Sequence, residues 1–298
     1  MIQVSIGIPV FNGERYLEQS MRSICEQTYG DFELLIYDNA STDRTAEISR
    51  DYLARDKRIR YFRNETNIGA PANFNRVFQL CRGRYHKWST ADDLLDRTLL
   101  AKSVEVLERE PEVVLCYPKT ALIDPRNELL SYYEDNLHLQ DHFPSERFSR
   151  LLDTIGLCNA HLGLIRREVL SRTALIGPHM GSDVSLLAEL SLRGRFFVIP
   201  EYLYFRRFHP ESSSWDRQDT QRQRNYYDPD NRAHFGMHIW KNYLALLGAV
   251  RRAPIGRREK FRSWRYLGRR FRWDRVDLSR EVYDQLRHVV ASLFLSQV

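Results

Sequence analysis

Two adjacent carboxylates in the stretch KWSTADDLLDR, residues 87–97, have the type and position to do chemistry. Asp92 and Asp93 follow a short run, RYHKW, that reads as a strand, and they precede a predicted helix. Neighbouring side chains at a strand end point in opposite directions, so one carboxylate can meet a ribose hydroxyl while the other ligates a hard divalent cation. Read alone, the pair is more typical of acids in the first turn of a helix, which the helix dipole favours.

A third carboxylate, Asp38, ends the predicted strand ELLIY at residues 33–37. A carboxylate only accepts hydrogen bonds, and it therefore suits an N–H donor such as the imide of uracil or thymine. The alternative role is an N-terminal cap for the following helix, which Ser41 and Asp43 can already supply.

Strand and helix patterns alternate four times within the first hundred residues, which predicts a parallel α/β sheet. The predicted strands cover residues 3–10, 33–37, 59–63 and 84–88. In open α/β sheets, ligands bind beyond the carboxyl ends of the strands. The polar residues that follow these strands directly should converge on that edge, and they are Asn12, Asp38, Asn39, Asn67, Asp92 and Asp93.

Three linked segments over roughly residues 3–97 resemble a known family. IGIPVFNGERYLEQSMRSICEQTY, LLIYDNASTDRT and NIGAPANFNRVFQLCRGRYHKWSTADD are similar, in order and spacing, to the motifs of family 2 glycosyltransferases. The resemblance implies an inverting, nucleotide-sugar-dependent enzyme. It also implies the GT-A fold, an α/β fold with a Rossmann-like, mixed and mostly parallel sheet flanked by helices.

The resemblance also implies roles for single residues in this half of the chain. Pro9, Phe11 and Glu14 would line the nucleotide pocket, and Asp38 would pair with the base. The loop beside the sugar nucleotide would be held by Asn67 and Asn75. Asp93 would ligate Mg²⁺ or Mn²⁺, while Asp92 would face the ribose or the donor sugar.

A later segment, GSDVSLLAELSLRGRFFVIPEYLYFRRFH, resembles the acceptor half of the family. The match implies that Asp183 is the general base that deprotonates the acceptor hydroxyl. The alternative for Asp183 is a first-turn acid behind a cap, Ser182. His209 would be a further metal ligand or a phosphate contact, with an ordinary surface histidine as the alternative. Arg206 or Arg207 would face the diphosphate, because a guanidinium matches phosphate oxygens bidentately.

The sequence departs from the family pattern at several positions. Thr90 stands where many relatives carry the first Asp of D-x-D, so the last Asp must be the main metal ligand. Asn39-Ala40 replaces the usual Asp-Gly, and Ser182 replaces a Glu. The stretch QRQRN, residues 221–225, lacks the Trp of processive synthases, which favours an enzyme that adds one sugar.

The charge of the chain is unevenly distributed. Residues 251–275 carry eleven Lys or Arg against two acids, a net charge of +9, so the rest of the chain carries −3 of the total of +6. Arginines interleaved with aromatic residues suit an anionic membrane surface. Nucleic acid is a less favoured partner because nothing else resembles a nucleic-acid module. A third interpretation is a solvated helix whose aromatics pack on the protein.

We therefore predict a GT-A domain over residues 1–215, with a nucleotide-sugar half at 1–97 and an acceptor half at 98–215. Residues 216–298 would form a polar linker and a basic helical C-terminal extension. The expected partners are a UDP- or dTDP-sugar and a glycan or lipid-linked acceptor, in polysaccharide, glycolipid or surface-glycan assembly. The chain shows no secretory leader and no apolar run of roughly 20 residues, so a cytoplasmic protein, peripheral on the inner membrane face, is expected.

Two alternative functions differ in class from a transferase. A protein of the same fold that binds a nucleotide or glycan without turnover would be expected to lack the acids at positions 93 and 183, and both are present. A dinucleotide-binding oxidoreductase requires a glycine-rich turn after the first strand, whereas PVFNGE offers one glycine. The four cysteines are far apart and lie among apolar neighbours, which indicates reduced, buried thiols.

Overall fold

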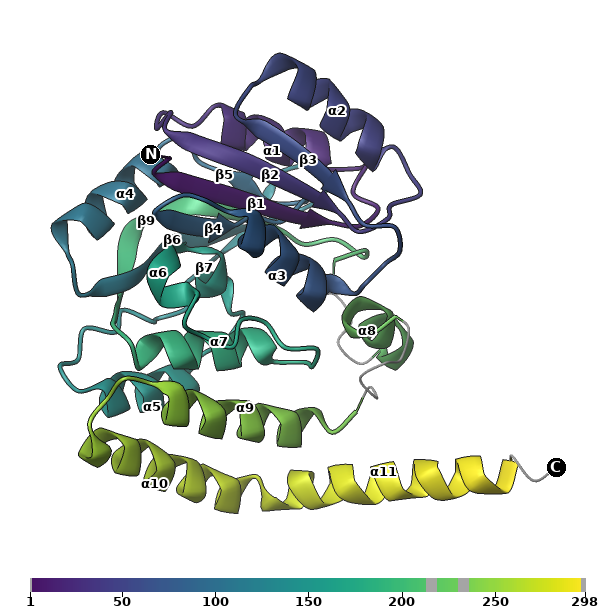
Figure 1. Cartoon of the computed structure of the whole chain (residues 1–298), viewed down its shortest axis with the longest axis vertical. Helices are drawn as coiled ribbons and strands as arrows, with labels where there is room; N and C mark the ends of the chain where they lie inside the picture. The colour runs from purple at the N-terminus through teal and green to yellow at the C-terminus, as the bar shows by residue number, and fades with distance from the viewer. Residues whose placement is uncertain (1, 213–218, 230–235, 296–298) are drawn as a thin grey trace.

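A nine-stranded mixed sheet forms the centre of the protein, and helices flank it (Figure 1). The computed structural model describes residues 2–212, 219–229 and 236–295. The strand order is β3-β2-β1-β4-β8-β6-β9-β5, and β7 pairs with β6 beside this path. The strands are β1 (Val4–Val10), β2 (Phe32–Asp38), β3 (Ile59–Arg63), β4 (Tyr85–Trp88), β5 (Leu94–Leu95), β6 (Val113–Ile123), β7 (Leu129–Tyr133), β8 (Leu164–Arg166) and β9 (Arg195–Arg207).

The first four strands are parallel, as the alternating pattern predicts. All seven residues of β2 are buried, and so are six of the seven residues of β1. Such continuous burial is typical of parallel strands that are covered on both faces. β1 and β2 pair from Val4 with Phe32 to Val10 with Asp38, which brings their carboxyl ends to the same edge.

The second half of the sheet is mixed. β8 is antiparallel to both β4 and β6, whereas β6 and β9 are parallel. β9 is one continuous strand, and it accommodates Pro200 where its pairing with β6 is irregular. The region between residues 125 and 180 contributes β7, β8 and three short helical segments, at residues 144–154, 159–162 and 167–170.

The helices cover the sheet and continue into a helical C-terminal part (Figure 1). They are α1 (Leu17–Cys25), α2 (Thr45–Arg55), α3 (Ala70–Leu80), α4 (Leu99–Arg109), α5 (Pro144–Thr154), the 3₁₀ helix η1 (Asn159–Leu162), α6 (Arg167–Leu170), α7 (Ser182–Ser191), α8 (Thr220–Tyr227), α9 (His238–Arg252), α10 (Arg257–Trp273) and α11 (Arg275–Leu295). None of the described helices is long and apolar enough to cross a bilayer.

The C-terminal helices pack on the second half of the sheet domain. Asn242 of α9 donates to the carbonyl of Met180, and Arg252 pairs with the buried Glu189 of α7 at 2.7 Å. Tyr266 of α10 donates to Asp153 of α5 at 2.5 Å. α8 lies at the start of the predicted linker and extension at 216–298, part of which is outside the described residues. The division into a domain and an extension stays a prediction.

Candidate functional site

A cavity of about 480 Å³ opens at the carboxyl ends of the first strands. Its walls come from segments far apart in the sequence: the loop after β1, the N-terminal part of α3, residues 90–93, the loop that contains η1, the start of α7, the end of β9 and α8. Among the predicted site residues, those that line it are Pro9, Phe11, Asn67, Asp92, Asp93, Asp183, Arg206, Arg207 and His209. The topology thus gathers both halves of the predicted site around one space.

Asp92 and His209 form a pair on one wall of this cavity. A carboxylate oxygen of Asp92 lies 2.9 Å from Nε2 of His209, and the Asp92 side chain is 27% exposed. The His209 ring also contacts Tyr16, with ring centroids 4.8 Å apart, which fixes its plane. Nδ1 of His209 is buried and forms no hydrogen bond among the described residues. A carboxylate and an imidazole that converge on a cavity are a donor set that divalent cations accept.

Asp93 differs from its neighbour because protein groups already satisfy it. It is 4% exposed, and it accepts hydrogen bonds from the Thr90 hydroxyl at 2.5 Å, the Tyr204 hydroxyl and the Arg207 backbone N–H at 2.7 Å. Burial, and then the adjacent Asp92, raises the pKa of Asp93 to about 6. Asp92 is therefore the less enclosed of the two carboxylates, and the metal role of Asp93 stays a prediction.

The two arginines predicted to face a diphosphate are used within the protein. Arg207 is 1% exposed, and each nitrogen of its guanidinium donates to protein oxygens, including the Asp92 carbonyl, Asn127 and Gln19. It also lies over the Tyr16 ring at 4.4 Å, a cation–π contact. Arg206 donates to the Leu157 carbonyl and to Asn159. Arg207 is therefore a structural residue of the cavity wall.

Amide side chains form a hydrogen-bonded cluster where β2 and β3 end. Asn39 donates to Asn67 at 2.7 Å and accepts from Asn64 at 2.9 Å, and Asn64 donates in turn to Asn73. Asn39, Asn67 and Asn73 line the cavity, and Phe11, 49% exposed, lies there as well. Asn73 was not identified from the sequence, although it stands only two residues before the predicted Asn75.

Three other predicted residues lie outside the cavity lining. Asp38 is fully buried and accepts from the Tyr61 hydroxyl at 2.7 Å and from the Ser41 N–H at 2.8 Å. Glu14 is exposed and accepts from the Arg44 N–H at the start of α2. The Asn75 amide bonds both the carbonyl and the N–H of Ile176. These three side chains brace loops around the cavity and do not reach into it.

Asp183 also lines the cavity, and it lies in the first turn of α7. The N-cap residue is Gly181, with φ of 80°, and not the predicted Ser182. The donor atoms of Asp183, Cys158 and His161 lie within 4.8 Å of one another. Burial raises the pKa of the Cys158 thiol and lowers that of His161, so both groups are neutral at pH 7. This sulfur-containing set would suit Zn²⁺ better than Mg²⁺.

Solved structures of GT-A glycosyltransferases have the same fold. The S. aureus TarS structure in complex with UDP-GlcNAc matches 92% of this chain and 74% of that chain, with a TM-score of 0.65 and 15% identity. The mannosyltransferase PcManGT from Pyrobaculum calidifontis, in complex with GDP-Man and Mn²⁺, matches 94% of this chain and 84% of that chain, with a TM-score of 0.55 and 16% identity. The fold defines a protein of the GT-A class, as the sequence predicts.

The sequence itself matches the model of the glycosyl transferase family 2 over residues 5–173. The chain therefore belongs to glycosyltransferase family 2. An uncharacterized glycosyltransferase of Methanocaldococcus jannaschii is 31% identical over 133 residues, which are 44% of this chain and 46% of the relative. The chondroitin synthase of Escherichia coli is 25% identical over 225 residues, 75% of this chain and 31% of the relative. The chain thus spans less than half the length of either relative.

Proposed function

We propose that this chain is an inverting glycosyltransferase that moves one sugar from a nucleoside diphosphate sugar to an acceptor hydroxyl. The observation that carries the proposal is a single cavity whose lining includes the Asp92–His209 pair, Asp183, Phe11 and the asparagine cluster. A donor that spans this cavity would place its base near Phe11 and its diphosphate near Asp92. UDP and dTDP are the preferred nucleotides, with support from the UDP-GlcNAc bound to TarS.

The reaction is a single displacement. Asp183 accepts the proton of the acceptor hydroxyl as the oxygen attacks the anomeric carbon, and the bond from that carbon to the diphosphate oxygen breaks. The nucleoside diphosphate leaves with the bonding electron pair, and the sugar inverts its configuration. Asp183 is suited to this role because it lines the cavity and is partly exposed, whereas Asp93 and Asp38 are enclosed by protein donors.

The residues fit a divalent cation such as Mg²⁺ or Mn²⁺. Asp92 and His209 would hold it through the Asp92 carboxylate and Nε2 of His209, which lie 2.9 Å apart at the cavity wall, while Nδ1 of the same ring lies 3.6 Å from the Glu211 carboxylate. Such a cation neutralises charge on a departing diphosphate. The cation would bind Asp92 and not Asp93, because binding at Asp93 would require its carboxylate to give up three hydrogen bonds from the protein.

The test is a panel of nucleotide sugars, assayed for donor hydrolysis, transfer and thermal shift with and without Mn²⁺. We expect UDP- or dTDP-sugars to give the largest response, and no response to any nucleotide would contradict the enzyme proposal. Asp183→Asn should reduce transfer at least about a thousand-fold and leave donor binding unchanged. Glu146→Gln, an exposed acid in the first turn of α5, is the matched control and should retain full activity.

The non-catalytic alternative makes a different prediction for the same variants. If the protein binds a nucleotide or glycan without turnover, Asp183→Asn and the unchanged protein would bind donor equally and neither would release the nucleoside diphosphate. The acceptor, whether a glycan or a lipid-linked sugar, and a role in polysaccharide assembly remain part of the proposal. A non-processive mode would appear as a product extended by one sugar only.

A further inference from the structure

The C-terminal helices α10 and α11 carry an outward-facing stripe of basic and exposed apolar residues. The two helices run end to end along one side of the molecule (Figure 1). Asp274 at the junction leaves the helical region, with ψ of 5°, but the N–H of Asp274 still donates to the Arg270 carbonyl and the N–H of Leu278 to the Asp274 carbonyl, so the helical spacing of side chains continues across it. Residues at steps of three and four therefore share one face from Arg258 to Arg287, over roughly 45 Å.

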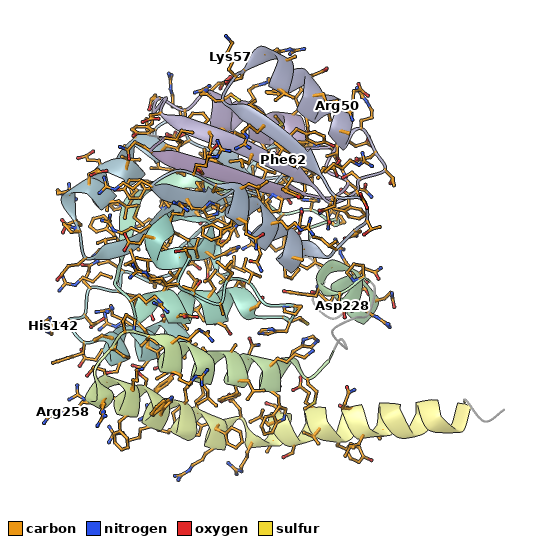
Figure 2. All side chains as sticks on the ribbon, viewed as in Figure 1. Arg50, Lys57, Phe62, His142, Asp228 and Arg258 are labelled. Atoms are coloured by element: carbon orange, nitrogen blue, oxygen red, sulfur yellow. The ribbon has the colours of Figure 1, made fainter. Side chains whose placement is uncertain are left out.

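The inner face of these helices is packed on the protein. In α10 the buried residues are Ser263, Tyr266 and Leu267, and in α11 Leu278 is 2% exposed. Glu281 accepts from backbone N–H groups at the start of α9, which holds α11 in the same orientation. The opposite face is therefore fixed outward, and Figure 2 shows Arg258 directed away from the body of the protein.

The outward face combines charge with exposed apolar surface. Its apolar members are Phe261, Val276 and Tyr283, each at least 58% exposed. Trp273, 64% exposed, lies beside the stripe at the junction of the helices. The arginines of the stripe are Arg258, Arg265, Arg269, Arg272, Arg280 and Arg287. Within the described part of the chain, only Arg280 has a carboxylate within 4 Å, that of Asp277 at 3.6 Å.

We propose that this stripe binds the surface of an anionic lipid bilayer and lies parallel to it. Unpaired arginines attract anionic headgroups, and exposed aromatic rings settle at the level of the headgroups. A soluble polyanion would satisfy the arginines but would leave Phe261 and Tyr283 in water. The inference goes beyond the proposed function, because it assigns a second surface whose binding requires no nucleotide sugar.

The experiment measures co-sedimentation of the whole chain with vesicles, without any nucleotide sugar. We expect binding to vesicles that contain phosphatidylglycerol, little binding to pure phosphatidylcholine, and weaker binding at high salt. R258Q/R265Q/R272Q should lower the affinity about a hundred-fold, since each arginine near the surface contributes roughly five-fold. The control R55Q/R109Q/R172Q removes the same charge from exposed positions elsewhere and should bind like the unchanged protein.

A second variant separates a bilayer from other anionic partners. F261S/Y283S keeps every charge and should still lose most vesicle binding, while brominated lipids should quench part of the tryptophan fluorescence of the unchanged protein. Equal vesicle binding by F261S/Y283S and the unchanged protein would overturn the proposal, because binding would then depend on charge alone, as it would for any polyanion. An absence of vesicle binding by the unchanged protein would also overturn it. Melting temperatures of all variants show whether a loss comes from unfolding.

Discussion

Two regions of the site use the same kinds of residue for different purposes. The cavity rim, which comprises Asp92, Asp183 and His209, faces a space large enough for a ligand. The buried polar layer comprises Asp38, Lys87, Asp93 and Arg207, whose charged groups are enclosed by protein partners, although Asp93 and Arg207 also line the cavity. Asp92 and Asp93 are adjacent in sequence, yet they belong to different regions.

The difference shows what each region has to do. The charges of the buried polar layer are matched by protein donors and acceptors: Lys87 donates to the Leu162 carbonyl, and Arg207 donates to Asn127. Burial lowers the pKa of Lys87 to about 8, and the nearby Asp93 opposes that change. These contacts tie β4, β9 and the η1 loop together. We infer that the buried polar layer holds the fold while the cavity rim is left to bind ligands.

The largest expected effect comes from removing a charge from the buried polar layer. Asp93→Ala leaves the Tyr204 hydroxyl, the Thr90 hydroxyl and a backbone N–H without their acceptor, and it leaves Lys87 without a nearby negative charge. We expect the free energy of unfolding to fall by about 3 to 5 kcal/mol, as for other broken buried ion networks. Urea denaturation followed by circular dichroism measures this change.

The matched control for that variant is its neighbour. Asp92→Ala removes a partly exposed carboxylate from the cavity rim, so the free energy of unfolding should change by less than about 1 kcal/mol. Equal destabilisation by the two variants would show that the cavity rim and the buried polar layer are one structural unit.

The next effect concerns the cation. Asp92→Asn and His209→Ala should each lower Mn²⁺-stimulated transfer about a hundred-fold and weaken Mn²⁺ binding measured by calorimetry, because each removes one of the two groups that meet at the cavity wall. Asp93→Asn should retain Mn²⁺ binding where the protein remains folded. The reverse result, with binding lost in Asp93→Asn and kept in Asp92→Asn, would restore the assignment made from the sequence.

The sequence predicted the elements and the edge of the site better than the direction of its side chains. Alternating patterns located the four parallel strands, and of the polar residues after them all but Asp38 line the cavity. Asp93, and not Asp92, is enclosed by protein donors because Tyr204 and Arg207, more than a hundred residues away, donate hydrogen bonds to it. The sequence shows that Asn39-Ala40 stands in place of the family's Asp-Gly. It does not show that Ala40 adopts φ of 64°, a backbone region that favours glycine.

A third prediction concerns Asp135, a buried carboxylate in the predicted acceptor half. It tests whether burial raises the pKa of Asp135 as it raises that of Asp93. Asp135 is 4% exposed, and burial raises its pKa to about 6 although the Ala160 N–H donates to it. A raised pKa in the folded state means that stability present below about pH 4 is lost as the pH rises through about 6. The ionisation of Asp135 should therefore cost about 3 kcal/mol between pH 4 and pH 7.

Asp135→Asn has no carboxyl group to ionise at this position, so it should not lose stability in this way between pH 4 and pH 7. The free energy of unfolding of the variant minus that of the unchanged protein should therefore increase over this pH range. Urea denaturation at several pH values measures the difference. Asp51→Asn, an exposed carboxylate of α2, is the control and should follow the unchanged protein at every pH. A constant difference between Asp135→Asn and the unchanged protein would show that Asp135 has an ordinary pKa.

The smallest expected effect is at Thr90, where the two regions meet. Its hydroxyl donates to Asp93 at 2.5 Å although the residue lines the cavity, so Thr90 belongs functionally to the buried polar layer. Thr90→Val removes one of three donors and should lower the free energy of unfolding by about 1 kcal/mol. Thr90→Ser keeps the hydroxyl and should be nearly neutral. Both variants should keep the Mn²⁺ response, because neither changes Asp92 or His209. If Thr90→Val instead abolished that response, the cation would depend on Asp93, and the separation of the cavity rim from the buried polar layer would fail.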